Sequence, residues 1–441
     1  MKRMVLLLMI LIIPAGILSA QKLLDIYKNG PVKLVADKIY GAKNNWESLF
    51  NLYYDTISTY DLPGGNAKKI VLAPDGSVFM SHKNRHEIWK FGPDGNFIKI
   101  FGSKGGKPHQ FPMLPTIQPV VDGKYIFTCD VNARMKFFDL DGNYFKSITL
   151  DYMPGNFQPT GNGQILLYGR VLWRKQETGT NYIVYNNRNI VVNLDMNTGK
   201  EKIIYDFFDD YSTRYQKTTN TDTVQRVSYS PPVKIYMPPP PPVAGRPVIT
   251  FFPDGRFIKS DRRKGEMKVF SISGKEINNF KLDILPVAVT EEDAKENYEK
   301  TKQSILKSIE RISASQNLPE SGKQRMLSQN KILLDSVEKY KDLKNYDKYL
   351  PYFSNVIVDD EGNLLVFEYT SREEKQSNIF NVIAYNSNGQ KLARTSFVCD
   401  DYDLSFSDAT FVISKGYVYA VAKLKNYSGM PLRLVKLKMT N

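Results

Sequence analysis

The stretch that decides the fold is Ile70–Phe111, which reads IVLAPDGSVFMSHKNRHEIWKFGPDGNFIKIFGSKGGKPHQF. Apolar runs alternate with two Asp-Gly turns, at Pro74-Asp75-Gly76 and Pro93-Asp94-Gly95, and a third run, Phe97 to Phe101, ends at Gly102. Alternating runs bounded by Asp-Gly dipeptides are the strongest short-range signal for β-hairpins. The stretch therefore predicts consecutive antiparallel strands.

The same strand–turn–strand unit recurs along the chain of 441 residues, each time with two turns. A repeat of this length indicates small sheets that bury their faces against their neighbours, and closure into a ring leaves only short sheet edges. We therefore predict an all-β fold, a six-bladed β-propeller of four-stranded blades. The paired turns are Asp75-Gly76 and Asp94-Gly95; Asp122-Gly123 and Asp141-Gly142; Gly161-Asn162-Gly163 and Asn197-Thr198-Gly199; Asp254-Gly255 and Ser273-Gly274; Glu361-Gly362 and Asn388-Gly389; Lys415-Gly416 and Ser428-Gly429.

The last unit ends at Asn441 and has room for about three strands, one fewer than a four-stranded blade needs. The missing strand has two candidates, Val32 to Val35 or Asp55 to Tyr60. We predict that an N-terminal segment, residues 21–60, contributes this closing strand to a ring formed by residues 61–441. Such closure joins the two chain ends and removes an open sheet edge.

The opening stretch resembles the NHL repeat, a propeller blade with the pattern D-G-x-hydrophobic-Y-V-A-D-x-x-N-H-R-I-x-x-F-D-x-D-G, then F-G-x-x-G-x-x-x-x-Q-F. Phe79 to Phe91 aligns with it without a gap, and His86 and Ile88 take its His and Ile positions. The departures are His82 in place of Asp, Arg85 in place of Asn and Glu87 in place of Arg.

The resemblance is strongest over residues 70–150. The second unit follows the D…N-x-R-I part with Asp130, Asn132, Arg134 and Met135, and Gly102-Ser103-Lys104-Gly105 through Gln110-Phe111 matches the inter-blade connection, with His109 at a common Gly position. The resemblance implies an exported six-bladed propeller in which these residues hold the blade together. Some six-bladed relatives are calcium- or zinc-dependent lactonases or lyases, but their channel constellation of acidic residues or histidines is not identified in this sequence.

A helical period interrupts the strands between the fourth and fifth units. Tyr298, Ile305, Ile309 and Ile312 lie on one helix face, and Met326, Leu333, Val337 and Tyr340 repeat the same intervals. Residues 290–349 are therefore predicted to form a helical hairpin, which is either a lid on the propeller or a partner-binding arm. Its predicted capping boxes are Thr290 with Asp293 and Ser321 with Gln324, and Asn317-Leu318-Pro319 separates the helices.

A second insertion, residues 206–246, is polar and contains five consecutive prolines, Pro238 to Pro242. Such a run favours the extended polyproline conformation. The segment is either a stiff surface loop or a ligand for a partner with an aromatic groove.

The first residues predict export. Met1-Lys2-Arg3 precedes the apolar run Met4 to Ile13, and Leu18-Ser19-Ala20 ends the segment with small residues, so residues 1–20 are read as a signal peptide. An uncleaved membrane anchor is the alternative; no later segment is apolar enough to span a membrane. The protein is therefore expected to be periplasmic or secreted.

The formal net charge of +14 is spread along the chain. Because nucleic-acid sites show a concentrated basic stripe, no nucleic-acid partner is expected. The excess is either a soluble basic surface or an attraction to a protein or envelope component that is anionic, such as lipids, sugars or acidic proteins. The two cysteines, Cys129 and Cys399, fall in units on opposite sides of the ring, so we predict two separate thiols. Oligomeric state is left open.

The sequence contains few signs of a catalytic site. No nucleophile elbow, phosphate-binding loop or C-x-x-C pair occurs. Histidine is limited to His82, His86 and His109, and the first two are four apart in a strand and loop, which does not place them on one helix face. Calcium is the one candidate cofactor, through the oxygen-bearing side chains Asp359, Asp360, Glu361, Asp400, Asp401 and Asp403, although these lack a recognised loop spacing.

No catalytic, cofactor-binding or metal-ligating residue is therefore assigned. The expected function is a non-catalytic exported scaffold that binds a protein or a ligand. The alternatives are a metal-dependent hydrolase or lyase with its site in the central channel, and a structural envelope protein whose helical hairpin docks an assembly.

Overall fold

The computed structural model describes residues 23–50, 67–82, 86–111, 116–129, 133–176, 182–208, 214–217, 247–315, 319–369, 378–404, 406, 411–429 and 431–441. The predicted signal peptide, the candidate strand Asp55 to Tyr60 and the prolines Pro238 to Pro242 lie outside these residues. Among the described residues, no helix combines the length and the apolar character needed to cross a membrane.

The chain forms consecutive antiparallel sheets, as expected for an all-β fold. The first is β2 (Ala67–Leu72), β3 (Val78–His82), β4 (Glu87–Phe91) and β5 (Phe97–Phe101); the second is β6 (Thr116–Val121), β7 (Tyr125–Cys129), β8 (Arg134–Asp139) and β9 (Tyr144–Thr149); the fourth is β15 (Val248–Phe251), β16 (Phe257–Asp261), β17 (Glu266–Phe270) and β18 (Glu276–Lys281).

The third sheet is larger, because its central hairpin extends well beyond its neighbours. It consists of β10 (Met153–Gly161), β11 (Gln164–Gln176), β12 (Tyr182–Asp195), β13 (Glu201–Phe208) and β14 (Arg214–Lys217). Part of residues 206–246 is thus strand and not loop, since β13 runs to Phe208 and β14 pairs with β12. The extended β12 offers a partner for both strands, which the polar composition of the segment did not indicate.

A nine-stranded sheet completes the fold. It contains β19 (Phe353–Val358), β20 (Leu364–Glu368), β21 (Ile379–Tyr385), β22 (Lys391–Val398), β1 (Val32–Ala36), β26 (Leu432–Thr440), β25 (Tyr417–Leu424), β24 (Phe411–Ser414) and β23 (Tyr402–Asp403). Its consecutive strands are antiparallel except at one place, where β1 pairs in parallel with β22 over Val32↔Phe397 and Lys33↔Val398.

The sheets turn where the Asp-Gly pattern predicts turns, and side chains of the same turns hold them. Asp139 Oδ1 accepts the backbone N–H groups of Asp141 (2.9 Å) and Asn143 (2.8 Å). Gly142 follows at φ 77°, in the left-handed region that glycine adopts without a steric penalty. The Asp139 carboxylate is therefore occupied with the backbone of its own turn.

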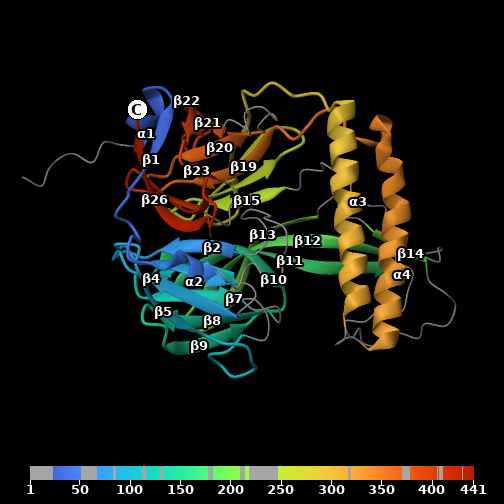
Figure 1. The fold of residues 1–441 in the computed structure, drawn as a ribbon, viewed down its shortest axis with the longest axis horizontal. Coiled ribbons are helices and arrows are strands. Elements are labelled where there is room, and N and C mark those ends of the chain that lie inside the picture. The colour runs from blue at the N-terminus through green and yellow to red at the C-terminus, as the bar shows by residue number, and fades with distance from the viewer. Residues whose placement is uncertain are drawn as a thin grey trace, which may run out of the picture.

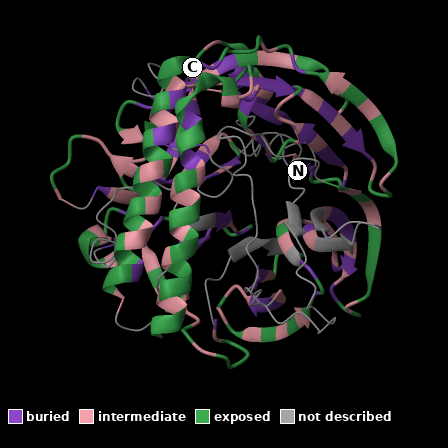
Figure 2. Cartoon of the chain, turned by 90° about the vertical axis from the view of Figure 1, so that its right-hand side faces the viewer, coloured by how far each residue is buried: buried purple, intermediate pink, exposed green. Residues whose placement is uncertain are grey.

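The first strands of successive sheets lie side by side around one axis (Figure 2). Hydrogen bonds cross between these sheets: Asn156 Nδ2 donates to Ile249 O (3.0 Å), Thr250 Oγ1 to Val356 O (3.4 Å), and Asn355 Nδ2 to the carbonyl of Phe406, which precedes β24 (2.6 Å). A ring of sheets joined through their innermost strands is the arrangement of a β-propeller.

The core lies between neighbouring sheets. One apolar cluster is shared by the first and second sheets, one by the second and third, one by the third and fourth, and one by the fourth sheet and β19–β21. Further clusters join β20–β22 to β24–β26 and then β25–β26 to the first sheet, which closes the circle. Cys129 and Cys399 are buried thiols in two different clusters, as predicted for separate thiols.

The N-terminal segment supplies the strand beside the C-terminus. Strand β1, one of the two predicted candidates, pairs antiparallel with β26 from Lys33↔Thr440 to Ala36↔Leu437. The helix α1 (Leu23–Lys28) precedes it and lies beside the C-terminus, and α2 (Trp46–Phe50) follows it (Figure 1). Asn441 Nδ2 donates to Ile26 O at 2.8 Å, so the two chain ends contact each other directly.

Two long helices, α3 (Glu291–Ala314) and α4 (Glu320–Val337), separate β18 from β19 and pack side by side in front of one part of the ring (Figures 1 and 2). The capping box of Thr290 and Asp293 is confirmed. The one predicted at Ser321 is wrong: Pro319 precedes a helix that starts at Glu320, and Gln324 Nε2 donates to Glu320 Oε1 (2.8 Å).

The base of this helical hairpin has a small core of its own. Tyr298, Val337 and Tyr340 are buried together, and the short helices η2 (Glu338–Lys341) and η3 (Leu343–Asn345) lead back to the ring. Further along the predicted apolar face, Met326 is 39% exposed. Near the tip, Ile312 is also buried, so the two helices pack at both ends of the hairpin.

Candidate functional site

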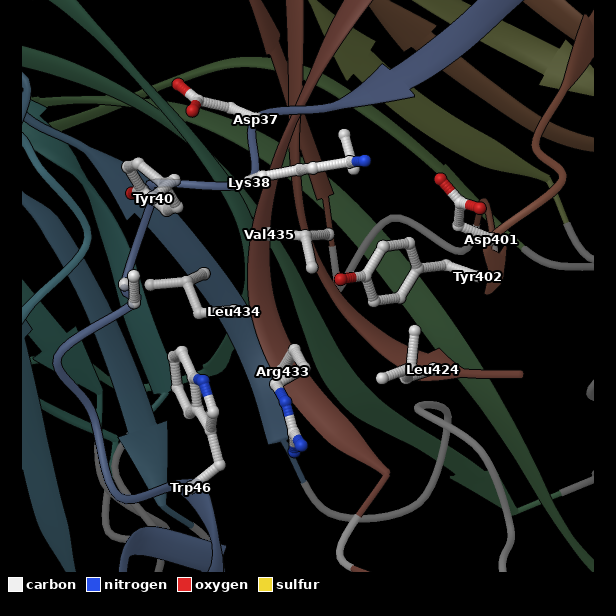
Figure 3. A pocket seen from close by; sticks show the side chains of 13 residues that line it. Asp37, Lys38, Tyr40, Trp46, Asp401, Tyr402, Leu424, Arg433, Leu434 and Val435 are labelled. Atoms are coloured by element: carbon white, nitrogen blue, oxygen red, sulfur yellow. The ribbon is translucent and has the colours of Figure 1, made fainter. Parts of the chain in front are cut away.

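A cavity of about 340 Å³ lies at the seam where the N-terminal segment meets the C-terminal strands (Figure 3). We call it the seam pocket. One wall is the chain that follows β1 and leads into α2; the other is β26 with the facing ends of β25 and β23. The lining residues are 36–38, 40–42 and Trp46 on the first side, and 401–402, Leu424 and 433–435 on the second.

Apolar side chains of the C-terminal strands also line the pocket. Leu434 and Val435 of β26 are buried on opposite faces of the strand, and Leu424 at the end of β25 is half-buried. The antiparallel pairing of Val421↔Leu434 and Ala420↔Val435 fixes their positions in the sheet. These side chains therefore offer a hydrophobic surface to the carbon skeleton of a bound molecule.

Arg433 lies at one side of the pocket between two aromatic rings. Its guanidinium carbon is 5.0 Å from the Tyr427 ring centroid and 5.8 Å from that of Trp46. Trp46 is itself stacked on Phe50, with centroids 5.8 Å apart. Arg433 Nη1 donates to Leu432 O at 2.7 Å. Because its planar face is held by rings and one edge by backbone, the guanidinium is orientated before any ligand arrives.

Tyr402 and Lys38 approach the same space from opposite walls. In Figure 3 the Tyr402 hydroxyl points toward Val435 in the middle of the pocket, and the Lys38 side chain extends across it toward Asp401. Burial raises the pKa of Tyr402, and Asp401 adds to the rise while Arg433 opposes it. The phenol is therefore protonated at neutral pH and can donate a hydrogen bond.

Asp37 is already engaged within the protein. Its Oδ1 accepts the backbone N–H of Ile39 at 3.2 Å, and its Oδ2 lies 4.0 Å from Lys436 Nζ. Lys436 therefore balances its charge. Beside it, the Tyr40 hydroxyl is buried with no hydrogen-bond partner among the described residues, and burial raises the pKa of this phenol.

The structure gives the predicted histidines separate positions. His86 has φ 58° and donates from Nδ1 to Phe111 O at 3.0 Å, which ties the β3–β4 turn to the inter-sheet connection. His109 is exposed on that connection. His82 pairs through its backbone with Glu87, and its side chain lies outside the described part of the structure. The described histidines thus serve the framework or the surface.

The acidic run 359–361 does not converge on a common point. Asp359 binds Asn363 and the Tyr27 hydroxyl, Asp360 accepts from Ser414 and Lys415, and Glu361 accepts the Leu23 N–H. Across the described residues, no group of three or more His, Cys, Asp or Glu side chains is placed to hold a metal ion.

Of the second acidic run, Asp401 reaches the seam pocket, and Asp403 belongs to β23. Sequence reasoning missed Lys38, Trp46 and Arg433, because they come from opposite ends of the chain and form no motif. The signal that could have found them is the expected closing strand: antiparallel pairing of 32–35 with the last strand brings the residues after the closing strand beside the start of the last strand.

No family model matches this chain, and no curated protein matches it. Solved structures are similar to it at low identity. They include a gluconolactonase of Xanthomonas campestris (10% identity, 85% of this chain and 86% of that chain, TM-score 0.39) and a Bacteroides fragilis protein provisionally assigned as exported (11%, 87% and 92%, 0.40). A virginiamycin B lyase of Staphylococcus aureus is a third (10%, 86% and 96%, 0.35). Such weak likeness assigns neither a family nor an activity.

The chemistry available in the seam pocket is recognition. A guanidinium, an ammonium and a phenol provide hydrogen-bond donors, and Asp401 provides an acceptor. Its described lining includes no Ser, Cys or His that could act as a nucleophile or as a base near neutral pH. The lining thus combines hydrogen-bond donors, a carboxylate acceptor and apolar side chains.

Proposed function

We propose that this chain is an exported six-bladed β-propeller that acts as a binding scaffold. Two observations support the blade count. The nine-stranded sheet divides into β19–β22 and β24–β25–β26–β1, which meet only in the short parallel pairing of β1 with β22. The apolar clusters between neighbouring sheets then give one interface per adjacent pair of blades.

The ligand site of this scaffold is the seam pocket, and its ligand is a small polar molecule. The observation that carries this proposal is the pair of walls: Lys38 from the N-terminal segment and Tyr402 and Arg433 from the C-terminal strands face one cavity. The helical hairpin lies at the opposite end of the molecule from β1, β26 and α2 (Figure 1). It provides a separate surface, a lid or a partner-binding arm on its own side of the ring.

The test is a ligand screen by thermal shift and saturation-transfer NMR on the mature protein. Ala42 is exposed at the pocket rim, so Ala42→Trp should block the cavity without disturbing the core; Ala314→Trp, exposed at the end of α3, is the matched control. Molecules that bind the wild type and the control but not Ala42→Trp support the proposal. A hit whose binding ignores Ala42→Trp would place the ligand elsewhere.

The alternative function, a metal-dependent hydrolase or lyase in the central channel, is decided by metal content. Stoichiometric calcium or zinc in the purified protein, with loss of a hydrolytic activity on chelation, would replace the binding proposal. Export is tested separately by N-terminal sequencing of protein from the periplasm or medium, where we expect the chain to start at Gln21.

A further inference from the structure

We propose that the helical hairpin α3–α4 is a docking surface for a second copy of this chain, and that two hairpins pack face to face and antiparallel as a four-helix bundle. The surface is separate from the seam pocket, so the inference goes beyond the proposed function. Three observations carry it: a row of leucines on one side of the hairpin, the self-complementary order of that row, and the area of the hairpin face.

Three leucines lie on the same side of the hairpin. Leu306 of α3 is 37% exposed, and Leu327 and Leu334 of α4 are half-buried. Leu306 directly follows Ile305, which packs against the core of the hairpin, and Leu334 directly follows Leu333 on the corresponding face of α4. Because antiparallel helices turn in opposite senses when seen from one end, one step forward along either helix leads to the same side of the pair. Leu327 is seven residues before Leu334 and shares its side.

This side of the hairpin is open to solvent along its length. On α3, Glu299 and Ser313 lie seven residues before and after Leu306, and both are exposed. The corresponding positions beyond the two leucines of α4, Glu320 and Lys341, are exposed as well. The leucines therefore form an apolar strip in the middle of a polar, solvent-facing row.

The α4 row is self-complementary. Glu320, Leu327, Leu334 and Lys341 follow one another at intervals of seven residues. When two α4 helices pack antiparallel about the midpoint of the leucines, Leu327 of one copy faces Leu334 of the other, and Glu320 faces Lys341. Each contact then occurs twice, as a two-fold symmetric interface requires.

The end charges keep contacts within their own copy and can still reach a second one. Lys341 Nζ lies 2.5 Å from Glu338 Oε2, and the lysine side chain is 57% exposed. Glu320 Oε1 accepts a hydrogen bond from Gln324 Nε2 at 2.8 Å. An ammonium has three donors and a carboxylate has two oxygens, so each group can add a contact with the other copy. Opposite charges at both ends then fix the antiparallel register of the two α4 helices.

Helix α3 agrees with the same two-fold axis. The Tyr298 hydroxyl donates to Glu338 Oε1 at 2.7 Å, so these two residues are level along the hairpin. Eight residues further toward the tip from each of them lie Leu306 on α3 and the midpoint of the two leucines on α4. Leu306 of one copy therefore meets Leu306 of the other on the axis. Two rows on different helices thus give one common axis.

The area of the face is sufficient for a specific dimer. The 18 residues of α4 give the shared face a length of about 27 Å, and two helices side by side give it a width of about 20 Å. Two such faces in contact cover roughly 1,100 Å², close to the roughly 1,000 Å² that a specific interface needs. A four-helix bundle is a common way to cover two hairpins of this kind.

Sedimentation equilibrium of the full mature protein, between about 1 and about 100 micromolar, tests the proposal. We expect a reversible monomer–dimer equilibrium with a micromolar dissociation constant, because the interface is at the small end of the range for specific complexes. Added salt should weaken the dimer, because the charge pairs at the ends of the row are exposed.

Matched variants locate the contact. Leu306→Glu brings two carboxylates together on the two-fold axis and should raise the dissociation constant about tenfold or more. The control is Ile332→Glu, because Ile332 precedes Leu333 and so lies on the opposite side of α4, where it is 53% exposed. This variant should dimerise like the wild type. Circular dichroism and thermal melts identify any variant that is simply destabilised.

Leu306→Cys tests the antiparallel arrangement, because it places one thiol from each copy at the axis. An added copper–phenanthroline oxidant accepts the two electrons released when the thiols form a disulfide, and the two protons pass to the solvent. We expect a disulfide-linked dimer of Leu306→Cys and none of Ile332→Cys. The native thiols of Cys129 and Cys399 are buried and are present in both variants.

The outcomes are distinct. A wild type that remains monomeric over the whole concentration range would overturn the proposal. So would a dimer that Leu306→Glu and Ile332→Glu weaken equally, or one whose Leu306→Cys variant does not cross-link. A monomer that binds phosphatidylglycerol vesicles, with binding lost in Leu306→Glu, would assign the leucines to a membrane surface and would also overturn it.

Discussion

Two buried tyrosines offer a matched test of what holds the chain ends together. The Tyr27 side chain of α1 is fully buried, and its hydroxyl donates to Asp359 Oδ2 at 3.0 Å across the fold. The Tyr40 side chain is also buried, but its hydroxyl has no partner in the described part of the chain. Replacing each tyrosine by phenylalanine removes the same atom and leaves nearly the same volume.

The two substitutions should change the free energy of unfolding differently. A hydrogen bond to a charged group contributes about 1.5–3 kcal/mol. Asp359 Oδ2 keeps a second donor, Asn363 Nδ2 at 2.9 Å, so Tyr27→Phe should lower the free energy of unfolding by about 2 kcal/mol. Tyr40→Phe removes a hydroxyl that lost its water without a protein partner. Its free energy of unfolding should therefore stay equal to the wild type or rise by up to about 1 kcal/mol.

The assay is urea unfolding followed by tryptophan fluorescence and circular dichroism at pH 7. The midpoint of Tyr27→Phe should fall with an unchanged slope, which identifies a change in stability and not in compactness. Equal losses in the two variants, or a larger loss in Tyr40→Phe, would refute the reasoning. Equal losses would mean that side-chain volume, and not hydrogen bonding, determines the loss of stability. A larger loss in Tyr40→Phe would mean that the Tyr40 hydroxyl has a hydrogen-bond partner in solution.

Three further predictions concern pH, turn geometry and closure. Burial raises the pKa of Asp359 above its ordinary value, so its stabilising contribution is complete below about pH 4 and is lost as the pH rises through the raised pKa. The unfolding free energy of the wild type should thus fall relative to Asp359→Asn between pH 3.5 and 7, and a constant difference would contradict this assignment. Gly274→Ala should destabilise strongly, because the new Cβ would lie 1.9 Å from the backbone oxygen of Ile204 at φ 84°, whereas Gly106→Ala meets no atom within 4 Å and should be tolerated in thermal melts. Deleting residues 21–60 should lower the stability of the whole ring, and calorimetry that still shows the full wild-type transition would argue against closure by this segment.

The strands were predictable from local chemistry. The turn that contains Asp141-Gly142 combines the Asp139 carboxylate, which binds the backbone of the turn, with a glycine that accepts positive φ, so a short sequence carries the whole signal. The start of α4 was not predictable in the same way, because both Ser321 and Pro319 can precede the first turn of a helix. The helix starts directly after Pro319, two residues earlier than a cap at Ser321 would place it. The strand β14 was missed because its partner, the extended β12, lies outside the segment itself.

The seam pocket required a longer inference. Lys38 and Arg433 are separated by almost the whole chain, and neither belongs to a recognisable pattern. Their meeting depends on the pairing of β1 with β26. The acidic residues that local sequence suggested as calcium ligands, Asp359 and Glu361, instead hold α1 through Tyr27 and Leu23. Long-range closure therefore decides which charged side chains line the pocket.

The antiparallel pairing of β1 with β26 also sets how the molecule responds to force. Lys33 lies opposite Thr440 and Ala36 opposite Leu437, so the outer ends of both strands leave the sheet at the same edge. Tension applied between the two ends of the chain pulls on the Lys33–Thr440 end of the pairing first. The backbone hydrogen bonds between β1 and β26 would therefore break one pair after another and not all at once. The β1–β26 pairing is thus the place where such tension opens the ring. A ligand that contacts both walls of the seam pocket would raise the force needed to separate these two strands.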